Sequence, residues 1–386
     1  MEAESPTSPC LIEALLPDEL LAFTLGMLPE GMVGIAARTC RRWFRCSPKA
    51  HRQTLLAKTV CSRLNLLQWA IHEADYQMTA RTCVLAARHG QLEVLQWARA
   101  QGCPWDSETC AAAAQFGHLG VLQWVLQNGC DRQHMNLCDK AAMGGQLEVL
   151  KWLGEQGHSW NENACLWAAL FGHLDVLHYL HENGCPWKAS AFTAAASKGH
   201  MHLLEFLHQH GCPWDVHTCA SAANLEVLKW LRERGCPWNE TTCISAAAGG
   251  KVDQLKWAMD NGCPWGQQQV FYCAAVNGRL NVLQWLREKG YPLSEETFIG
   301  AAERDRMEVL QWAHENGFPW GVRTCEAAAR GGHLHILKWL RAKGCPWDER
   351  ICATADQCNN VEIVEWAYSN GCPLPDHLMG TYSFSG

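Results

Sequence analysis

Cysteine and histidine are the side chains of this sequence best suited to chemistry, because thiols and imidazoles bind metals, form disulfides and transfer protons. The chain has 22 cysteines and 18 histidines in 386 residues. No two cysteines have the Cys-x-x-Cys spacing that begins many zinc sites. The cysteines instead recur at two positions of a regular pattern, one inside an alanine-rich segment, as at Cys110, and one after a glycine, as at Cys130.

Both cysteine positions are also filled by other residue types. The alanine-rich position holds phenylalanine twice, and the position after the glycine holds an aromatic residue or histidine, as seen at Phe192, Phe298, His158, Tyr291 and Phe318. Phenylalanine cannot replace a metal ligand, whereas it can replace a buried apolar residue. We therefore predict that the cysteines pack in a core, with no metal, no disulfide and no cofactor.

Histidine follows a glycine at four equivalent positions, His118, His173, His200 and His333. The counterparts in other copies are Gln146, Lys251 and Arg279, so the position does not require an imidazole. We predict a hydrogen bond between neighbouring units there. The sequence also lacks a glycine-rich phosphate loop, a paired-carboxylate signature and a nucleophile elbow. No residue is nominated as catalytic, and we predict that the chain is not an enzyme.

The elements that position these residues are repeated. One aromatic position recurs at Trp69, Trp97, Trp124, Trp152, Tyr179, Phe206, Trp230, Trp257, Trp285, Trp312, Trp339 and Trp366. The steps between copies are 27 or 28 residues, apart from one step of 24. This period gives twelve copies, of which the first is degenerate, as a terminal repeat often is.

One copy, residues 109–130, shows what each unit should form. Thr109 is predicted to cap an alanine-rich helix that Gly117 ends. A second helix follows with a stripe of apolar residues that includes Trp124, which we predict to pack in the core. Such a helix–turn–helix can bury its stripe only against its neighbours. Three residues of the turn are missing before Leu225, which predicts a local irregularity.

The pattern Gly-His-Leu-x-Val-Leu-x-Trp-Leu, followed by Gly-Cys-x-Trp-Asp/Asn, resembles the second helix and exit loop of the ankyrin repeat over residues 55–374. Ankyrin repeats have about 33 residues, and most of the shortfall here lies between Asp106 and Thr109, where the family forms a β-hairpin finger. The resemblance implies an all-α, ankyrin-like helix–turn–helix solenoid with short loops and little or no strand. The tryptophan-rich variant is similar to repeat proteins carried by large DNA viruses of amoebae.

Residues 16–43 resemble an F-box, with Leu-Pro-Asp-Glu-Leu at the start and Cys-Arg-Arg-Trp at the end. The resemblance implies a three-helix module, residues 11–54, that docks onto the Skp-type adaptor of a cullin–RING ubiquitin ligase. The matching adaptor-binding positions are Leu16, Pro17, Leu20, Leu28, Pro29, Cys40 and Trp43. The alternative is a helical cap that only seals the first repeat. Residues 1–10 are expected to be disordered, and residues 375–386 to form a C-terminal cap or tail.

Charge and hydropathy limit the classes of partner that the chain is expected to bind. Charged residues make up 18% of the chain and the net charge is −7, so no basic surface for nucleic acid is expected. No signal peptide or membrane-spanning run is recognisable. We expect a monomer in the cytoplasm, that of the host if the chain is viral, with the nucleus as an alternative.

The partners are therefore expected to be proteins. Positions that the repeat leaves variable on the first helices are predicted to bind an unknown target, namely Gln115, Phe116, Leu166, Trp167, Leu170, Phe171, Glu303 and Arg304. The alternative is that some of these side chains only fill gaps between repeats. The leading hypothesis is the substrate-recognition subunit of a Skp/cullin/F-box ligase. The alternative is a stand-alone ankyrin-like scaffold or competitive inhibitor with no link to a ligase.

Overall fold

A computed structural model describes residues 64–74, 76–130 and 136–378 of the chain. Within these ranges the regular structure consists of α-helices and one 3-10 turn, Asp376–Leu378, with no strand. This confirms the all-α prediction and the loss of the finger strands for the part described. None of these helices has the length and apolar character that crossing a membrane would require.

Several predictions lie outside the described residues. They concern the N-terminus 1–10, the F-box-like module 11–54, the start of the first repeat, and the end of the tail from residue 379. The seven predicted adaptor-binding residues all belong to this part of the chain.

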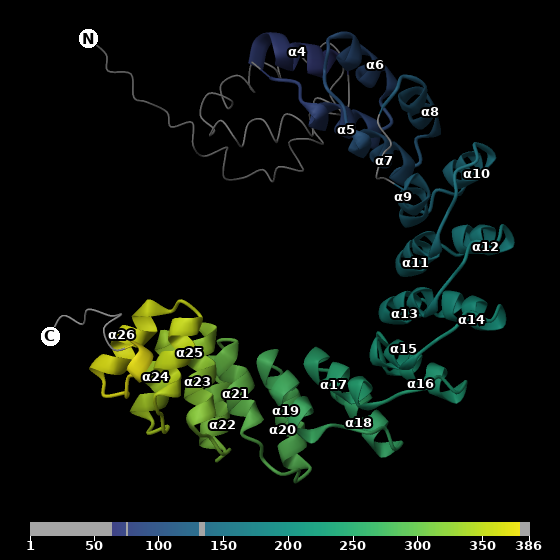
Figure 1. The fold of residues 1–386 in the computed structure, drawn as a ribbon. Coiled ribbons are helices and arrows are strands. Elements are labelled where there is room, and N and C mark those ends of the chain that lie inside the picture. Colours follow the sequence, from purple (N-terminus) through teal and green to yellow (C-terminus); the bar gives the residue numbers. More distant parts are fainter. Residues whose placement is uncertain (1–63, 75, 131–135, 379–386) are drawn as a thin grey trace, which may run out of the picture. The chain divides into compact units, whose positions relative to one another are not determined.

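The chain divides into two compact units, residues 1–187 and 188–386. The described helices of the first unit are α4 (Leu64–Ala74), α5 (Ala80–Arg88), α6 (Leu92–Ala100), α7 (Ser107–Gln115), α8 (Leu119–Gln127), α9 (Leu137–Met143), α10 (Leu147–Glu155), α11 (Glu162–Phe171) and α12 (Leu174–Glu182). The first helices of successive repeats pack side by side, α5 on α7, α7 on α9 and α9 on α11. The second helices form another layer beside them, as Figure 1 shows.

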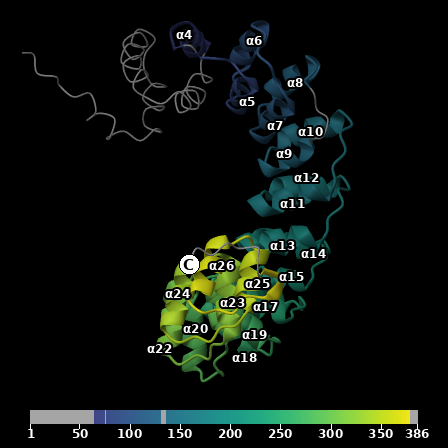
Figure 2. The ribbon, with the colours of Figure 1, turned by 60° about the vertical axis from the view of Figure 1, so that its left-hand side comes forward.

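The second unit has the same two-layer order within itself (Figure 2). Its first helices are α13 (Ala189–Lys198), α15 (Val216–Ala220), α17 (Glu240–Gly249), α19 (Gln267–Val276), α21 (Glu296–Glu303), α23 (Val322–Gly331) and α25 (Arg350–Gln357). Its second helices are α14 (Met201–Gln209), α16 (Leu225–Glu233), α18 (Val252–Asp260), α20 (Leu280–Glu288), α22 (Met307–Glu315), α24 (Leu334–Ala342) and α26 (Val361–Ser369).

The start of the first helix differs from the prediction. Helix α7 begins at Ser107, and its N-cap is Asp106, whose carboxylate accepts a hydrogen bond from the Glu108 N–H at 3.1 Å. Thr109 is the third residue of the helix and is fully buried, so its predicted role as N-cap was wrong. The hydroxyl of a threonine at this third position can turn back to the cap in some repeats, although that of Thr109 has no hydrogen-bond partner. In α5, Thr82 Oγ1 accepts a hydrogen bond from the Thr79 N–H at 3.1 Å.

The core of each unit is made of small residues on the first helices and leucine or valine on the second. Ala113 and Ala114 of α7 and Leu122 and Val125 of α8 have no exposed surface. Alanine allows close approach of neighbouring first helices. Leucine and valine on the second helices bury larger apolar surfaces, and each Å² of apolar surface removed from water stabilises the fold by about 25 cal/mol. The predicted burial of apolar stripes by neighbouring helices is therefore confirmed in the described repeats.

Most of the repeated aromatic residues lie outside this core. Trp124 is only half-buried, and among the copies whose side chains the structure describes the buried exceptions are Phe206 and Trp230. The indole of Trp124 packs edge-on against the loop residue Trp105, with ring centroids 5.7 Å apart. The same pair recurs between Trp347 and Trp366 at 5.8 Å. The predicted core position was wrong for Trp124, because leucine and valine fill the core of this repeat and the indole covers its edge together with the loop tryptophan.

Neighbouring repeats are joined by hydrogen bonds from the position after the glycine. His118 Nε2 donates to the Arg88 carbonyl at 3.0 Å, and Lys251 Nζ donates to the Ala222 carbonyl at 2.8 Å. These carbonyls lie at or just beyond the end of a first helix, where carbonyls lack intrahelical donors. The predicted bridge between units is confirmed at these positions, and the exchange of histidine for lysine shows that it needs only a donor.

The short repeat contains the predicted irregularity. Helix α15 has only 5 residues, Val216–Ala220. Asn224 serves as N-cap of α16, where its side chain accepts from the Val227 N–H at 3.0 Å. The Ala223 N–H donates to the Ala196 carbonyl at 2.9 Å. The hydrogen bond from Ala223 thus ties the shortened turn to the preceding repeat.

Candidate protein-binding surface

Two aromatic rings stand out on the first helices of the first unit. Phe116 follows α7 and is 38% exposed, and Phe171 ends α11 and is 49% exposed. Helix α9 packs between α7 and α11 and contributes Met143, whose sulfur accepts a hydrogen bond from Gln115 Nε2 at 3.4 Å. We call this surface the aromatic face, formed by Arg88, Gln115, Phe116, Met143, Leu166, Trp167, Leu170 and Phe171.

Neighbouring side chains hold the rings of the aromatic face in place. The guanidinium of Arg88 lies over the Phe116 ring, 4.6 Å from its centroid. The rings of Trp167 and Phe171 are stacked with centroids 6.2 Å apart. Side chains held in one conformation lose little rotamer entropy when a partner covers them. The arrangement is therefore suited to binding an apolar protein surface.

The structure brings six of the eight predicted target-binding residues onto this face. The sequence did not nominate Arg88 and Met143. Arg88 and Met143 occupy the same repeat position as Gln115 and Leu170. Aligning the repeats at this position could have identified them.

A carboxylate lies on the same helix layer. The Oδ1 atom of Asp139, in the first turn of α9, is buried and has no hydrogen-bond partner. Burial raises the pKa of Asp139 to about 6, although the charge of the neighbouring Lys140 opposes this shift. Other copies place Val84, Ala111 and Leu166 at this repeat position, so the exchange of an apolar residue for a carboxylate was visible in the sequence.

The other two predicted residues, Glu303 and Arg304, belong to the second unit. Glu303 Oε2 accepts a hydrogen bond from the Tyr272 hydroxyl at 2.7 Å, and this bond, together with burial, raises the pKa of Tyr272 to about 12. The Glu303 carbonyl accepts from His333 Nε2 at 3.2 Å. Arg304 is exposed at the end of α21. Glu303 thus links neighbouring repeats, and only Arg304 projects from the surface.

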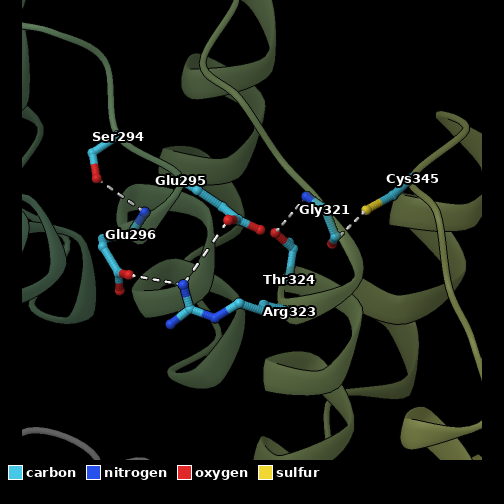
Figure 3. Close-up of polar contacts among 7 residues, drawn as sticks. All are labelled: Ser294, Glu295, Glu296, Gly321, Arg323, Thr324 and Cys345. Carbon is cyan, nitrogen blue, oxygen red and sulfur yellow. Dashed lines mark hydrogen bonds and ion pairs between the residues drawn. The ribbon is translucent and has the colours of Figure 1, made fainter.

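The second unit also has a polar hollow of about 590 Å³ at the start of its first helices. It is lined by Gln267, Gln268, Gln269, Leu293, Ser294, Glu295, Glu296 and Arg323. Figure 3 shows the Arg323 guanidinium between two carboxylates, 3.1 Å from Glu296 Oε1 and 4.0 Å from Glu295 Oε2. Arg323 therefore forms ion pairs with both carboxylates. The sequence pattern did not single them out, because polar residues are common at helix starts.

A metal site requires several ligand side chains close together around one ion. In the described ranges, no group of three or more histidine, cysteine, aspartate or glutamate side chains is placed to hold a metal ion. The 18 cysteines there are thiols, and most are buried in the way predicted for packing residues.

Comparison with known families agrees with the repeat geometry. A family model described as "Ankyrin repeats (many copies)" matches residues 110–153 and 165–208. No curated protein matches the chain. Ankyrin repeats typically build protein-binding scaffolds without enzymatic activity, which agrees with the exposed aromatic face between α7 and α11. The F-box-like and viral resemblances of the sequence remain predictions. The predicted resemblance to ankyrin repeats is confirmed for these two segments, and ankyrin repeats there support a scaffold role in protein–protein interaction.

Proposed function

We propose that this chain is the substrate-recognition subunit of a Skp/cullin/F-box ubiquitin ligase and that its aromatic face binds the target protein. The observation that supports target binding is the pair of exposed rings, Phe116 and Phe171, held in place by Arg88 and Trp167. Large aromatic side chains bury about 150–250 Å² each, and they often supply most of the binding energy of an interface. Loss of both rings should therefore abolish target binding.

The ligase half of the proposal rests on the sequence between Leu16 and Trp43. Its opening and closing motifs occur at the separation typical of an F-box, without a gap. In this arrangement the module recruits the adaptor and the repeats hold the target. The chemistry of ubiquitin transfer belongs to the partner enzymes, which agrees with the absence of a nominated catalytic residue.

Adaptor binding is tested by co-purification. The full chain and its Leu16→Ala/Pro17→Ala/Trp43→Ala variant are each mixed with a Skp-type adaptor. We expect the adaptor to bind the unmodified chain and to be lost from the variant. Equal absence of the adaptor from both samples refutes the ligase half and leaves the alternative, a stand-alone scaffold or competitive inhibitor.

Target binding is tested by proximity labelling in cells with the full chain. The Phe116→Ser/Phe171→Ser variant should lose the proteins that the unmodified chain labels. Val361→Ser is the matched control, because Val361 is 46% exposed on α26 and does not belong to the aromatic face. If all three chains label the same proteins, the aromatic face is not the binding surface. A target whose abundance is unaffected by the adaptor-binding variant favours the stand-alone scaffold.

A further inference from the structure

The buried cysteines are arranged in pairs, which packing alone does not require. Cys83 of α5 donates a hydrogen bond to Cys103 in the loop after α6, with the two sulfur atoms 3.5 Å apart. The sulfur atoms of Cys165 and Cys185 are 3.3 Å apart. The same contact between a first helix and the loop of its own repeat joins Cys110 to Cys130, Cys219 to Cys236, Cys243 to Cys263, Cys325 to Cys345, and Cys352 to Cys372.

We propose that these pairs are oxidation sites, in which a peroxide converts the two thiols of one repeat into a disulfide, and that a neighbouring arginine makes some pairs react before others. The proposal is independent of the target-binding function, because it concerns buried thiols on the opposite side of the first helices from the aromatic rings.

The loop thiol of each pair is held close to the first helix by the backbone. Cys103 Sγ donates to the Thr79 carbonyl at 3.3 Å. Figure 3 shows the equivalent bond from Cys345 Sγ to the Gly321 carbonyl, at 3.4 Å. A disulfide requires a sulfur–sulfur distance of about 2.05 Å, so the paired sulfur atoms, 3.5 Å apart in Cys83–Cys103 and 3.3 Å apart in Cys165–Cys185, must move closer together. Both sulfur atoms are buried, so a small oxidant reaches them only when the exit loop opens locally.

An arginine lies beside the loop thiol in only some repeats. Arg99 donates a hydrogen bond to the Cys103 carbonyl and lies over the Trp105 ring, 4.2 Å from its centroid. Arg341 donates to the Cys345 carbonyl at 2.6 Å. Arg232 contacts the Cys236 carbonyl in the same way. In the remaining cysteine pairs this position holds an uncharged or weakly basic residue, namely Leu126, His181, Met259 and Tyr368.

Charge favours Cys103 over the loop thiol of the next repeat. The hydrogen bond from Cys83 lowers the pKa of the Cys103 thiol, burial opposes the shift, and the charge of Arg99 lowers the pKa further. The hydrogen bonds from Cys110 also lower the pKa of the Cys130 thiol, and Arg99 lowers it as the smallest contribution, but burial and the nearby Asp106 carboxylate both raise it. Since the thiolate is the nucleophile, Cys103 should react with peroxide before Cys130.

The chemistry balances without a further reactant. The Cys103 thiolate attacks one oxygen of hydrogen peroxide, the O–O bond breaks, and the departing oxygen takes a proton and leaves as water. The product is the sulfenic acid of Cys103. The Cys83 sulfur then attacks the Cys103 sulfur, the S–O bond breaks, and the departing hydroxide takes the Cys83 proton to form a second water. Two thiols are oxidised and one peroxide is reduced.

The test uses the full, reduced chain. Hydrogen peroxide is added for increasing times, remaining thiols are blocked with N-ethylmaleimide in denaturant, and the cross-linked peptides are identified by mass spectrometry. We expect links only within repeats, with Cys83–Cys103 forming before Cys110–Cys130. The exposed Cys358 reports how much oxidant has acted. The proposal is overturned if Cys358 is fully modified while the pairs remain thiols, or if the links join different repeats.

Two exchanges test the role of the arginine. Arg99→Leu should slow the formation of Cys83–Cys103, and Leu126→Arg should speed the formation of Cys110–Cys130. The Cys325–Cys345 pair of the second unit is the internal control in both variants, because its neighbouring arginine is Arg341. A change of one unit in thiol pKa alters the rate by roughly threefold, because the gain in thiolate is partly offset by lower nucleophilicity. Arg99→Lys, which keeps the charge, should react like the unmodified chain. Unchanged order in both variants refutes the role of the arginine.

The order of the two chemical steps is tested by removing the second thiol. In Cys83→Ser the Cys103 sulfenic acid should accumulate and be trapped by dimedone. In Cys103→Ser, Cys83 should give little adduct at the same peroxide dose. Equal trapping at both sulfur atoms refutes Cys103 as the attacking residue.

Discussion

Asp139 offers a test of how strongly the packing of the first helices controls stability. Its Oδ1 atom is buried without a partner, and burial raises its pKa to about 6 from an ordinary value of 3.8. The folded chain therefore holds this proton more tightly than the unfolded chain. Between pH 3.8 and 6 the folded state binds more protons, so the free energy of unfolding falls as pH rises through this window and is level above it.

The size of the effect follows from the shift. Each pKa unit corresponds to about 1.4 kcal/mol, which gives about 3 kcal/mol for a carboxyl group with no access to solvent. The residue is half-buried, and solvent screening reduces the expected contribution to about 1 kcal/mol. Asp139→Asn removes the charge and keeps the shape, so it should stabilise the protein by about 1 kcal/mol at pH 7.5 and have little effect below pH 4.

The assay is urea unfolding of the full chain and of Asp139→Asn, followed by fluorescence at a series of pH values. Asp139→Leu serves as a second variant, because leucine occupies this repeat position at Leu166. A variant that is less stable than the unmodified chain at pH 7.5, with the difference lost at low pH, would refute the reasoning. That result would show that the carboxylate is held in its charged form by a partner.

Two further predictions concern the turn between helices. Gly117 and Gly129 have φ angles of 79° and 76°. A Cβ on Gly117 would lie 2.1 Å from a side-chain oxygen of the next repeat, whereas one on Gly129 would meet no atom within 4 Å. Gly129→Ala should cost about 1 kcal/mol of unfolding free energy and Gly117→Ala more; equal losses in urea unfolding would contradict the close approach. His118→Ala should cost about 1 kcal/mol by leaving the Arg88 carbonyl without its donor, and His118→Lys should cost less; equal losses would contradict the bridge.

Much of the fold could be predicted because the sequence repeats. The recurring glycine at Gly117 and the small residues around Ala113 each appear in many copies, so local ambiguity in one copy is removed by the others. The irregular turn before Leu225 was visible as a missing segment for the same reason.

The errors arose where a residue type has two plausible positions. Threonine is common both at the N-cap and in the first turn, and only the backbone shows that Thr109 is the third residue of its helix. Tryptophan can fill a core or cover its edge, and only the structure shows that Trp124 packs at the edge against Trp105. Neither of these two positions can be inferred from the repeat period.

The aromatic face was predicted in part. Phe116 and Phe171 were identified because aromatic side chains often dominate binding at interfaces, and the structure shows them exposed. Met143 and Arg88 were missed because they look ordinary within their own copies. Their contacts with residues of the neighbouring repeat, Arg88 with Phe116 and Met143 with Gln115, become apparent only in the structure.

The central claim is that each helix pair is buried only by its neighbours. Leu122 of α8 has no exposed surface, and Leu122→Ala should leave a cavity that costs about 2–5 kcal/mol. Hydrogen exchange measured by mass spectrometry on the full chain should then show faster exchange in α7, α8 and the adjoining repeats, while α25 and α26 keep their protection. Equal loss of protection along the whole chain, or none at α7 and α8, would contradict the claim.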